Sequence, residues 1–442
     1  MPDAWGERLP RTLGLFNATA VLVGVTVGSG IFRVPALVAT QLHDPGPVLA
    51  CWVAGGLIAL CGAMSMAELA ASLPRSGGVF AYLLESFGPA PAFVFGWTEL
   101  TVIRASALGA TATIFAEYLG YFIDLRPQQV RFVAAAAIVA IGTINYFGAR
   151  RAATLMGVAT VGKYAAVMAL GLLAFTAGSG SGTHFLPVWG PEVHLSMMAT
   201  ALIPVMWTYD GWADLSFMGG EVSNPQRTLP LALVLGTVCV MLVYLIVNVG
   251  FMYLLPMQQI AGAKLIAATA AAHIPLLGGA GAGVIAVVVV VSAISGLNGS
   301  MMTGPRIFYA MAEKGLFFRA VGRVSPQFQT PSVAIWLATA LGVVYVLQND
   351  FAQLADRFIL GIWPFYALAV AGIFVLRRRR PDLQRPYRVP GYPMVPLLFL
   401  LASFGLIANA LVTDLRDTAV TLGIIAAGIP MYYLWKLRAL RR

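Results

Sequence analysis

The stretch Gly24-Val-Thr-Val-Gly28-Ser29-Gly30-Ile31-Phe32, which Pro35 follows, interrupts an apolar run long enough to cross a bilayer. Glycines two positions apart with a serine between them form poor helix. Irregular backbone at membrane depth is tolerated only where protein or a water-filled cavity covers it. The stretch therefore predicts a break that frees backbone N–H groups near mid-membrane. A helix that restarts there would point its partial positive charge at a carboxylate.

A second interruption lies in Pro204-Val-Met-Trp207-Thr208-Tyr209-Asp210-Gly211-Trp212. A proline followed by an aspartate and a glycine within an apolar run predicts another break, whose freed carbonyls can accept hydrogen bonds from an ammonium group. The alternative for either glycine cluster is close helix packing through small residues. The two breaks are five apolar runs apart, and interrupted helices at matching places in two halves are typical of a secondary transporter's substrate site. The matching positions of the two breaks favour a substrate site over close helix packing.

The composition indicates an integral membrane protein. The 442 residues are 59% hydrophobic and 10% charged, with a mean hydropathy of +0.82. An ordinary soluble domain has about 45–50% apolar and about 25% charged residues. The net charge of +10 is explained by Lys and Arg in cytoplasmic loops, so we expect lipid rather than nucleic acid around the chain.

Apolar runs of roughly 20 residues, the length that crosses a bilayer, number about twelve. They are 13–40, 48–73, 89–121, 130–147, 153–177, 195–219, 229–255, 281–310, 332–348, 355–376, 394–413 and 418–436. We expect an all-α membrane protein with one domain over residues 1–442. Residues 1–177 and 195–376 would form inverted repeats of five helices each, and residues 394–436 would add two helices.

Positive charge predicts the orientation. With the N-terminus inside and the spans alternating, most of the 28 Lys and Arg residues fall on the inner side, among them the run Arg377 to Arg380. Both termini are therefore expected in the cytoplasm. The polar start from Met1 to Arg11 precedes an apolar run too long for a signal-peptide core, so no cleaved signal is expected. The short loops and compact termini suit a prokaryotic inner membrane.

Several blocks in order along the chain resemble the amino acid–polyamine–organocation superfamily, and most closely its L-type amino acid transporter branch. The first three blocks are Gly28-Ser-Gly-Ile-Phe32, Ala67-Glu-Leu69 with Ser76-Gly-Gly78 and Ala81-Tyr82, and Arg104 with Ser106. The fourth is Tyr209-Asp-Gly-Trp212 with Glu221, Asn224-Pro225, Arg227 and Leu229-Pro230. The last two are Ser300 with Arg306, Ala310 to Ala312 and Gly315, and Arg385-Pro-Tyr-Arg-Val-Pro-Gly391. The resemblance covers nearly the whole chain. It implies a leucine-transporter-type fold with discontinuous first and sixth helices, and alternating access around a mid-membrane amino acid.

The resemblance also implies site residues. Gly28, Ser29 and Gly30 would bind the substrate carboxylate through backbone N–H groups, with the serine hydroxyl as a further candidate. The carbonyls of Thr26, Trp207, Thr208 and Asp210 would hold the α-amino group. Trp207 matches the bulky aromatic that the branch places over its substrate as an outer gate; the alternative is a core or lipid-facing tryptophan.

Lys163 lies well inside the fifth apolar run, where a cation is costly, by about 2.5–3.5 kcal/mol on insertion scales. At the matching position the L-type branch has a lysine where sodium-coupled relatives hold a cation. This implies sodium-independent transport, with the lysine linking the first and fifth helices. A lysine that titrates and couples proton flow is the alternative.

Two charged residues are specificity candidates. Asp210 near the side-chain pocket would favour cationic substrates, unless it merely pairs with another buried group. Arg33 stands where the branch usually has a small or apolar residue, and this departure puts a simple cationic preference in doubt. Arg33 could neutralise Asp210, attract anionic substrates or face the outer vestibule. The charged residues Glu68, Glu99, Arg104, Glu117, Glu221 and Arg306 are expected to form inter-helix ion pairs or inner-gate contacts.

The remaining motifs narrow the function class. The chain has no GxxxxGK[ST] phosphate loop and no redox or hydrolytic motif, so we expect no enzyme activity, no cofactor and no bound metal. The loop at 122–130 has no cysteine, so no disulfide-linked heavy chain is expected. The sequence and the resemblance predict a sodium-independent exchanger or facilitator of neutral L-amino acids, with cationic L-amino acids as a further candidate substrate class. A proton-coupled amino acid importer, a polyamine transporter and a non-transporting amino acid sensor of the same fold are alternatives.

Overall fold

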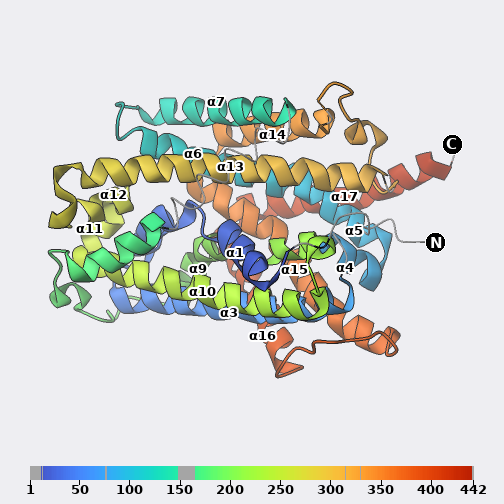
Figure 1. Cartoon of the computed structure of the whole chain (residues 1–442), viewed down its shortest axis with the longest axis horizontal. Helices are drawn as coiled ribbons and strands as arrows, with labels where there is room; N and C mark the ends of the chain where they lie inside the picture. Colours follow the sequence, from blue (N-terminus) through green and yellow to red (C-terminus); the bar gives the residue numbers. More distant parts are fainter. Residues whose placement is uncertain are drawn as a thin grey trace.

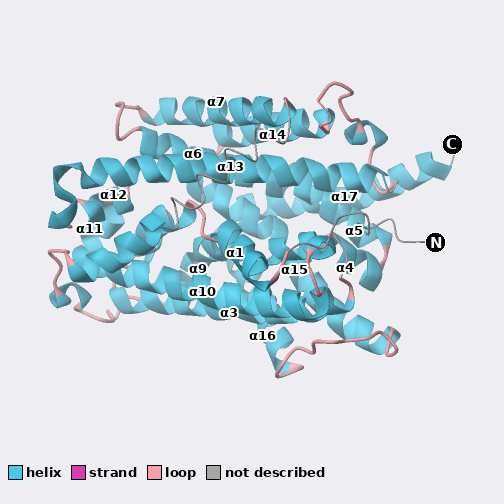
Figure 2. Cartoon of the chain, in the orientation of Figure 1, coloured by secondary structure: helices cyan, strands magenta, loops and turns pink. Residues whose placement is uncertain are grey.

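The computed structural model describes residues 11, 13–74, 77–147, 165–313, 315–328 and 330–440. Within these ranges the secondary structure is helical, apart from one isolated β-bridge between Leu13 and Val222. The long helices lie side by side along the long axis of the molecule (Figures 1 and 2). This arrangement is expected of a chain whose backbone polar groups must be satisfied within each lipid-crossing segment.

Seven of the described helices are long and apolar enough to cross a membrane. They are α3 (Pro45–Ser72), α7 (Pro127–Tyr146), α10 (Pro225–Leu254), α13 (Gly281–Glu313), α15 (Phe351–Arg379), α16 (Met394–Thr413) and α17 (Leu415–Leu440). Each overlaps a run predicted from hydropathy. The shorter α14 (Ser332–Gln348) coincides with another predicted run. Of the run 153–177, the described part holds an apolar helix over Ala165–Thr176.

Each of the other three predicted runs contains more than one helical element. Run 13–40 holds α1 (Leu15–Thr26), the 3₁₀ turn η1 (Gly30–Phe32) and α2 (Val34–Leu42). Run 195–219 holds α9 (Leu195–Tyr209) and the 3₁₀ helix η4 (Trp212–Glu221). Run 89–121 holds α5 (Pro89–Thr98), the π-helical turn η2 (Glu99–Ile103) and α6 (Arg104–Leu119), which follow one another without leaving helical backbone. The first two runs are therefore broken, as predicted, and the third is continuous.

Three short helices were not predicted. They are α4 (Gly78–Phe87), α11 (Met257–Gly262) and α12 (Ile266–Ala271). The first packs against α15, the second against α2 and the third against α13. They lie between the predicted spans and are shorter than the roughly 20 residues that a hydropathy search detects. Single 3₁₀ turns complete the loops: η3 (Gly182–Phe185), η5 (Pro275–Ala280) and η6 (Arg319–Gly322).

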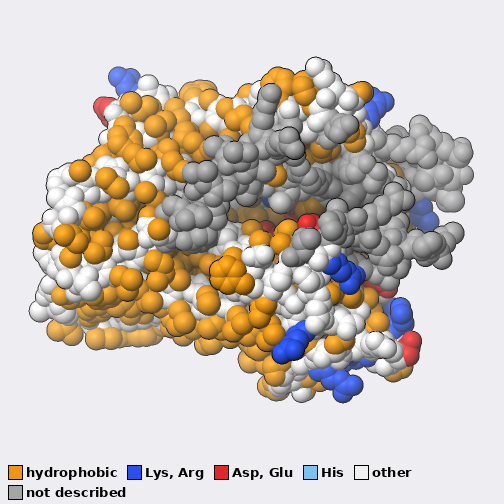
Figure 3. Space-filling model, viewed as in Figure 1, with side chains coloured by type: hydrophobic (Ala, Val, Ile, Leu, Met, Phe, Trp, Pro, Cys, Tyr) orange, Lys and Arg blue, Asp and Glu red, His pale blue; other side chains and the backbone are white. Residues whose placement is uncertain are grey.

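The outer surface is apolar along most of the length of the molecule. Large apolar side chains such as Phe404 on α16, 73% exposed, and Leu242 on α10, 53% exposed, point outward. Figure 3 shows hydrophobic side chains covering the left part of this face, whereas most of its Lys and Arg side chains gather toward the right end. An apolar belt with charge at one end is the surface expected of a multi-pass membrane protein.

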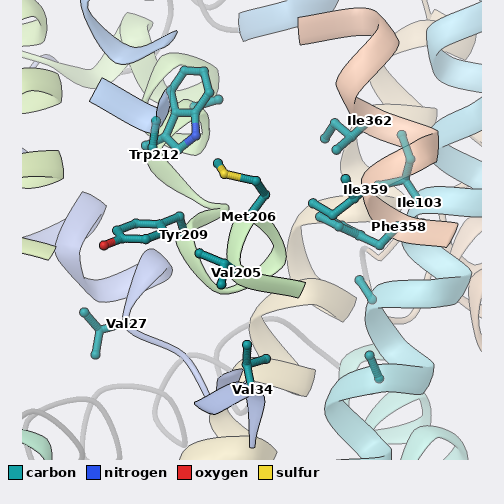
Figure 4. Packing of buried hydrophobic residues seen from close by; sticks show 14 of the residues in the cluster. Val27, Val34, Ile103, Val205, Met206, Tyr209, Trp212, Phe358, Ile359 and Ile362 are labelled. Atoms are coloured by element: carbon teal, nitrogen blue, oxygen red, sulfur yellow. The ribbon is translucent and has the colours of Figure 1, made fainter. Parts of the chain in front are cut away.

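The two broken helices cross the centre of the molecule. The segments α1 and α2 pack against α10 and α9, and α9 packs against α3 and α15. Figure 4 shows Val27 and Val34 flanking the first break, with Val205, Met206 and Tyr209 of α9 beside them and a cluster of apolar side chains of α15 opposite. The apolar core therefore surrounds both breaks and holds their freed backbone groups away from bulk water.

Candidate functional site

The first break begins where α1 ends at Thr26. Val27 has φ −73° and ψ 79°, close to the inverse γ-turn. The N–H of Gly28 accordingly donates to the carbonyl of Thr26, two residues back, at 2.7 Å. Helical hydrogen bonds resume only with η1, where the N–H of Phe32 donates to the carbonyl of Ser29. The predicted break at 28–30 is therefore present, and this local turn ends α1.

Three consecutive N–H groups open into the first break. Within the described part of the chain, the backbone N–H groups of Ser29, Gly30 and Ile31 make no hydrogen bond. All three residues are buried. Buried backbone donors are nearly always paired in native proteins, with protein, water or a ligand. A carboxylate, which only accepts hydrogen bonds, is the chemical group that fits this set of donors.

The second break follows Tyr209, the last residue of α9. Asp210 is extended, with φ −62° and ψ 153°, and Gly211 has φ +113° before η4 begins. A side chain at Gly211 would be strained at this φ and would place its Cβ 3.0 Å from the Cα of Thr26. Glycine thus lets the second break touch the end of α1.

The two breaks also meet at Gly30. A Cβ on Gly30 would lie 2.9 Å from Cζ3 of Trp207 and 3.1 Å from the hydroxyl of Thr208. The structure therefore brings together the residues predicted for the carboxylate and those predicted for the α-amino group. The Trp207 ring packs edge-on against Phe351 of α15, with ring centroids 5.2 Å apart.

Tyr244 of α10 lies between the two breaks, and no sequence pattern predicted its role. Its hydroxyl lies 2.8 Å from the carbonyl of Thr26 and 3.0 Å from the carbonyl of Thr208, within donating distance of both. The Thr26 carbonyl also accepts from the N–H of Gly28. Because the Tyr244 hydroxyl has one proton, it donates to one of the two carbonyls at a time. The assignment of the Thr26 carbonyl to the α-amino group stays a prediction. The Thr208 carbonyl keeps a lone pair.

Asp210 lies in a polar cluster between α9 and α15. Its Oδ1 accepts a hydrogen bond from the hydroxyl of Tyr366 at 2.9 Å. Asp214, Glu99 and Arg104 lie within electrostatic range of it. Arg104 forms an ion pair with Glu99, so this pair joins two parts of one span rather than two helices. Asp210 thus has the Tyr366 hydroxyl as its hydrogen-bond partner. Arg104 is the only cation of this cluster among the described residues.

Arg33 has a different partner from the one considered above. Its Nε donates to Oε2 of Glu117 on α6 at 2.8 Å, and its guanidinium lies 5.6 Å from the ring centroid of Phe351. Within the described residues Glu117 is its ion-pair partner, and Asp210 is not. The reason is positional, because Arg33 lies beyond η1 and its side chain reaches Glu117 near the C-terminal end of α6.

Two further predictions concern residues away from the breaks. Lys163 lies outside the described residues. Glu68 of α3 forms the expected inter-helix ion pair, since Nε and Nη2 of Arg377 on α15 bind its two oxygens at 2.8 Å and 2.6 Å. The backbone N–H of Val389 donates to the same carboxylate at 2.8 Å. Glu68 therefore fastens the loop before α16 to α3 and α15.

Comparisons with known proteins agree with this architecture. The profile of a family described as "Amino acid permease" matches residues 13–434. The serine/threonine exchanger SteT of Bacillus subtilis is 29% identical over 434 residues, covering 97% of this chain and 98% of the exchanger. The human b(0,+)-type amino acid transporter 1 is 28% identical, covering 97% of this chain and 88% of the relative. The human cystine/glutamate transporter is 28% identical, covering 97% and 86%.

These relatives are transporters rather than enzymes, and the match extends over both helix breaks and the segments around them. The sequence blocks at Gly28–Phe32 and Tyr209–Trp212, the helical membrane architecture and the full-length match lead to one assignment. The chain belongs to the amino acid permease family, within the L-type-like part of the amino acid–polyamine–organocation superfamily.

Proposed function

We propose that this permease is a sodium-independent secondary transporter, an exchanger or facilitator, of L-amino acids that works by alternating access. The observation that carries the proposal is the row of buried N–H groups at Ser29, Gly30 and Ile31, which have no hydrogen-bond partner in the described part of the chain and lie directly beside the second helix break. A zwitterion offers a carboxylate to those donors and an ammonium to carbonyls across the gap. Both ends would be bound by backbone groups, which leaves the side chain free to vary.

The α-amino group is assigned to the carbonyls of Trp207, Thr208, Asp210 and Thr26. Among the described contacts the first two each accept one hydrogen bond, so each retains a lone pair. Gly28 shapes the first break, and the serine hydroxyl at 29 lies beside the carboxylate position. Trp207, which packs on Gly30 and Phe351, would serve as the outer gate over the substrate.

Asp210 supports acceptance of cationic amino acids besides neutral ones. Its carboxyl group accepts a hydrogen bond from a neutral hydroxyl, and Arg33 pairs with Glu117 instead, so the side chain of a cationic substrate would be the ion-pair partner of Asp210. The relatives' names indicate that side-chain preference varies in the family, since one is a serine/threonine exchanger and another a cystine/glutamate transporter. Selectivity in this chain would therefore rest on charged residues near the breaks.

The topology and coupling are part of the proposal. Residues 1–177 and 195–376 would form the inverted repeats, each contributing one broken helix, with both termini cytoplasmic in a prokaryotic inner membrane. Sodium independence rests on Lys163 replacing a cation. The loop 122–130 lacks a cysteine, which supports function without a disulfide-linked heavy chain.

Counterflow in proteoliposomes tests the proposal. Vesicles holding the purified permease are loaded with unlabelled serine or none, and uptake of labelled serine is measured with sodium replaced by choline. Faster uptake into loaded vesicles, unchanged without sodium, is the expected result. Acceleration by an inward pH gradient instead would indicate the proton-coupled alternative. Saturable binding without flux would indicate a sensor, and strict sodium dependence would contradict the assignment of Lys163.

A further inference from the structure

The ion pair between Arg33 and Glu117 lies at the edge of the proposed site. Arg33 sits at the junction of η1 and α2, three residues beyond Gly30, and Glu117 lies near the end of α6. Both side chains are partly accessible, with 19% and 18% of their surface exposed. The pair is therefore not sealed in the core, and a solute that reaches the first break can sense its charge.

One aromatic layer separates this pair from the break. The Arg33 guanidinium lies over Phe351, Phe351 packs edge-on against Trp207, and Trp207 abuts Gly30. Phe351 and Trp207 are the ring pair that the proposed function places over the substrate. Arg33 is thus the first cation outward of that layer in the described part of the chain.

Among the described residues, the charges around the pair balance. In this part of the chain, the charged groups besides Arg33 that act on Glu117 are Lys264, between α11 and α12, and Asp350, which caps α15. Two cations therefore face two carboxylates, and loss of Glu117 alone would leave a net positive charge at this place. An unbalanced cation at the mouth of a cleft raises the local concentration of anionic solutes and lowers that of cationic ones.

We propose that Glu117 is a specificity-determining residue, which masks Arg33 and so prevents the outer mouth from favouring amino acids with acidic side chains. This inference rests on the proposed function and names the substrate class that the site disfavours. The masked pair leaves Asp210 as the charge that acts on a substrate side chain. The permease then prefers neutral and cationic zwitterions over acidic ones.

The competing explanation is that the Arg33–Glu117 pair only holds η1 against α6. The neighbouring Tyr118 allows this structural role to be tested separately from the effect of charge. The hydroxyl of Tyr118 donates to the carbonyl of Phe32 at 2.7 Å and accepts from the N–H of Ala267 at 3.4 Å. Tyr118 therefore already ties η1 to α6 and α12. Replacing the Glu117 carboxylate by an amide removes charge and leaves this link in place.

The test compares Glu117→Gln, Arg33→Gln and the double variant in proteoliposomes, with glutamate, alanine and lysine as labelled substrates. Glu117→Gln should raise the glutamate-to-alanine uptake ratio on the order of tenfold at low ionic strength, and salt should reduce the gain. The double variant should return the ratio to that of the unmodified chain. Arg33→Gln alone, which leaves Glu117 unmasked, should shift preference the other way, toward lysine.

Glu85→Gln is the matched control, because it removes a carboxylate from an ion pair with Arg380 on segments outside the site. An unchanged ratio in both single variants, or an equal gain in Glu85→Gln, would overturn the inference. If Glu117→Gln does not fold, the opposite shift in Arg33→Gln decides the question. Absence of alanine flux in the unmodified chain would instead overturn the proposed function, and this inference with it.

Discussion

Gly30 and Trp207 lie so close that a Cβ added to Gly30 would come within 2.9 Å of Cζ3 of the tryptophan ring. Real Cβ atoms essentially never approach a neighbour this closely. The contact joins the two helix breaks, since one residue belongs to η1 and the other to the end of α9. Any side chain at position 30 must therefore push the breaks apart or displace the proposed gate.

Gly30→Val should abolish uptake while the protein still inserts into the membrane. Overpacking of this kind costs about 1–3 kcal/mol, and here the displaced groups are Trp207 and Thr208. Gly28→Ala is the informative comparison, because its Cβ would meet nothing nearer than the Thr26 carbonyl at 3.8 Å. Uptake in Gly28→Ala should exceed that in Gly30→Ala. Normal uptake by Gly30→Val, with insertion confirmed by size-exclusion chromatography, would count against the site.

Tyr244→Phe should lower both thermal stability and affinity for amino acids. It removes the hydroxyl that lies between the Thr26 and Thr208 carbonyls, and the loss of one such hydrogen bond costs about 0.5–1.5 kcal/mol. Tyr209→Phe removes a similar buried bond, from its hydroxyl to the Trp52 carbonyl at 3.0 Å, but does not join the breaks. Both variants should melt earlier in a thermal-shift assay. An equal loss of affinity in the two would show that Tyr244 has no special part in the site.

Asp210→Asn should reduce lysine uptake relative to alanine roughly tenfold, which corresponds to about 1.4 kcal/mol of lost discrimination. Tyr366→Phe removes the hydroxyl that binds Asp210 but keeps the carboxylate, so it should retain the preference for lysine. Because Arg33 pairs with Glu117 instead, the effects of Arg33→Val and Asp210→Gly should add within about 0.5 kcal/mol. A lysine-to-alanine ratio that survives Asp210→Asn would remove Asp210 from the specificity determinants.

Glu68→Ala should destabilise the chain, by about 1–3 kcal/mol, because it removes the acceptor of the buried Val389 N–H and of two Arg377 hydrogen bonds. Glu68 is 2% exposed and binds both Arg377 and the N–H of Val389. Glu85→Ala, which breaks the longer and more exposed contact to Arg380, should change the melting temperature little. Similar melting temperatures for both variants would contradict the assigned role of Glu68.

The membrane spans and the two helix breaks could be predicted from the sequence, because each depends on the residues of its own segment. A run of apolar residues predicts a membrane helix, and Gly28-Ser-Gly30 and Asp210-Gly211 predict loss of helix wherever they occur. The partners were not predictable in this way. Arg33 meets Glu117 across 84 positions, Tyr366 meets Asp210 across 156 and Tyr244 meets Thr26 across 218. A tyrosine or glutamate inside an apolar run indicates no particular partner, so these contacts required the fold.

The short helices α11 and α12 could not be predicted from hydropathy either, because their structure also depends on the fold. In a hydropathy search α11 and α12 look like loop, since neither is long enough to span. Their helical form comes from packing against α2 and α13, which is tertiary context. The π-helical turn at Glu99–Ile103 likewise has no local signature, and it changes which face of the span carries Arg104.

Backbone groups at the two helix breaks are expected to bind both ends of a zwitterion. Competition against equilibrium binding of a labelled amino acid to the purified permease measures this binding directly. The competitors are the unlabelled amino acid, its methyl ester, which lacks the carboxylate, and its N-acetyl derivative, which lacks the ammonium. We expect only the unmodified amino acid to compete with the labelled one, and Gly30→Val to bind none of the three compounds. Equal competition by the methyl ester would contradict this expectation.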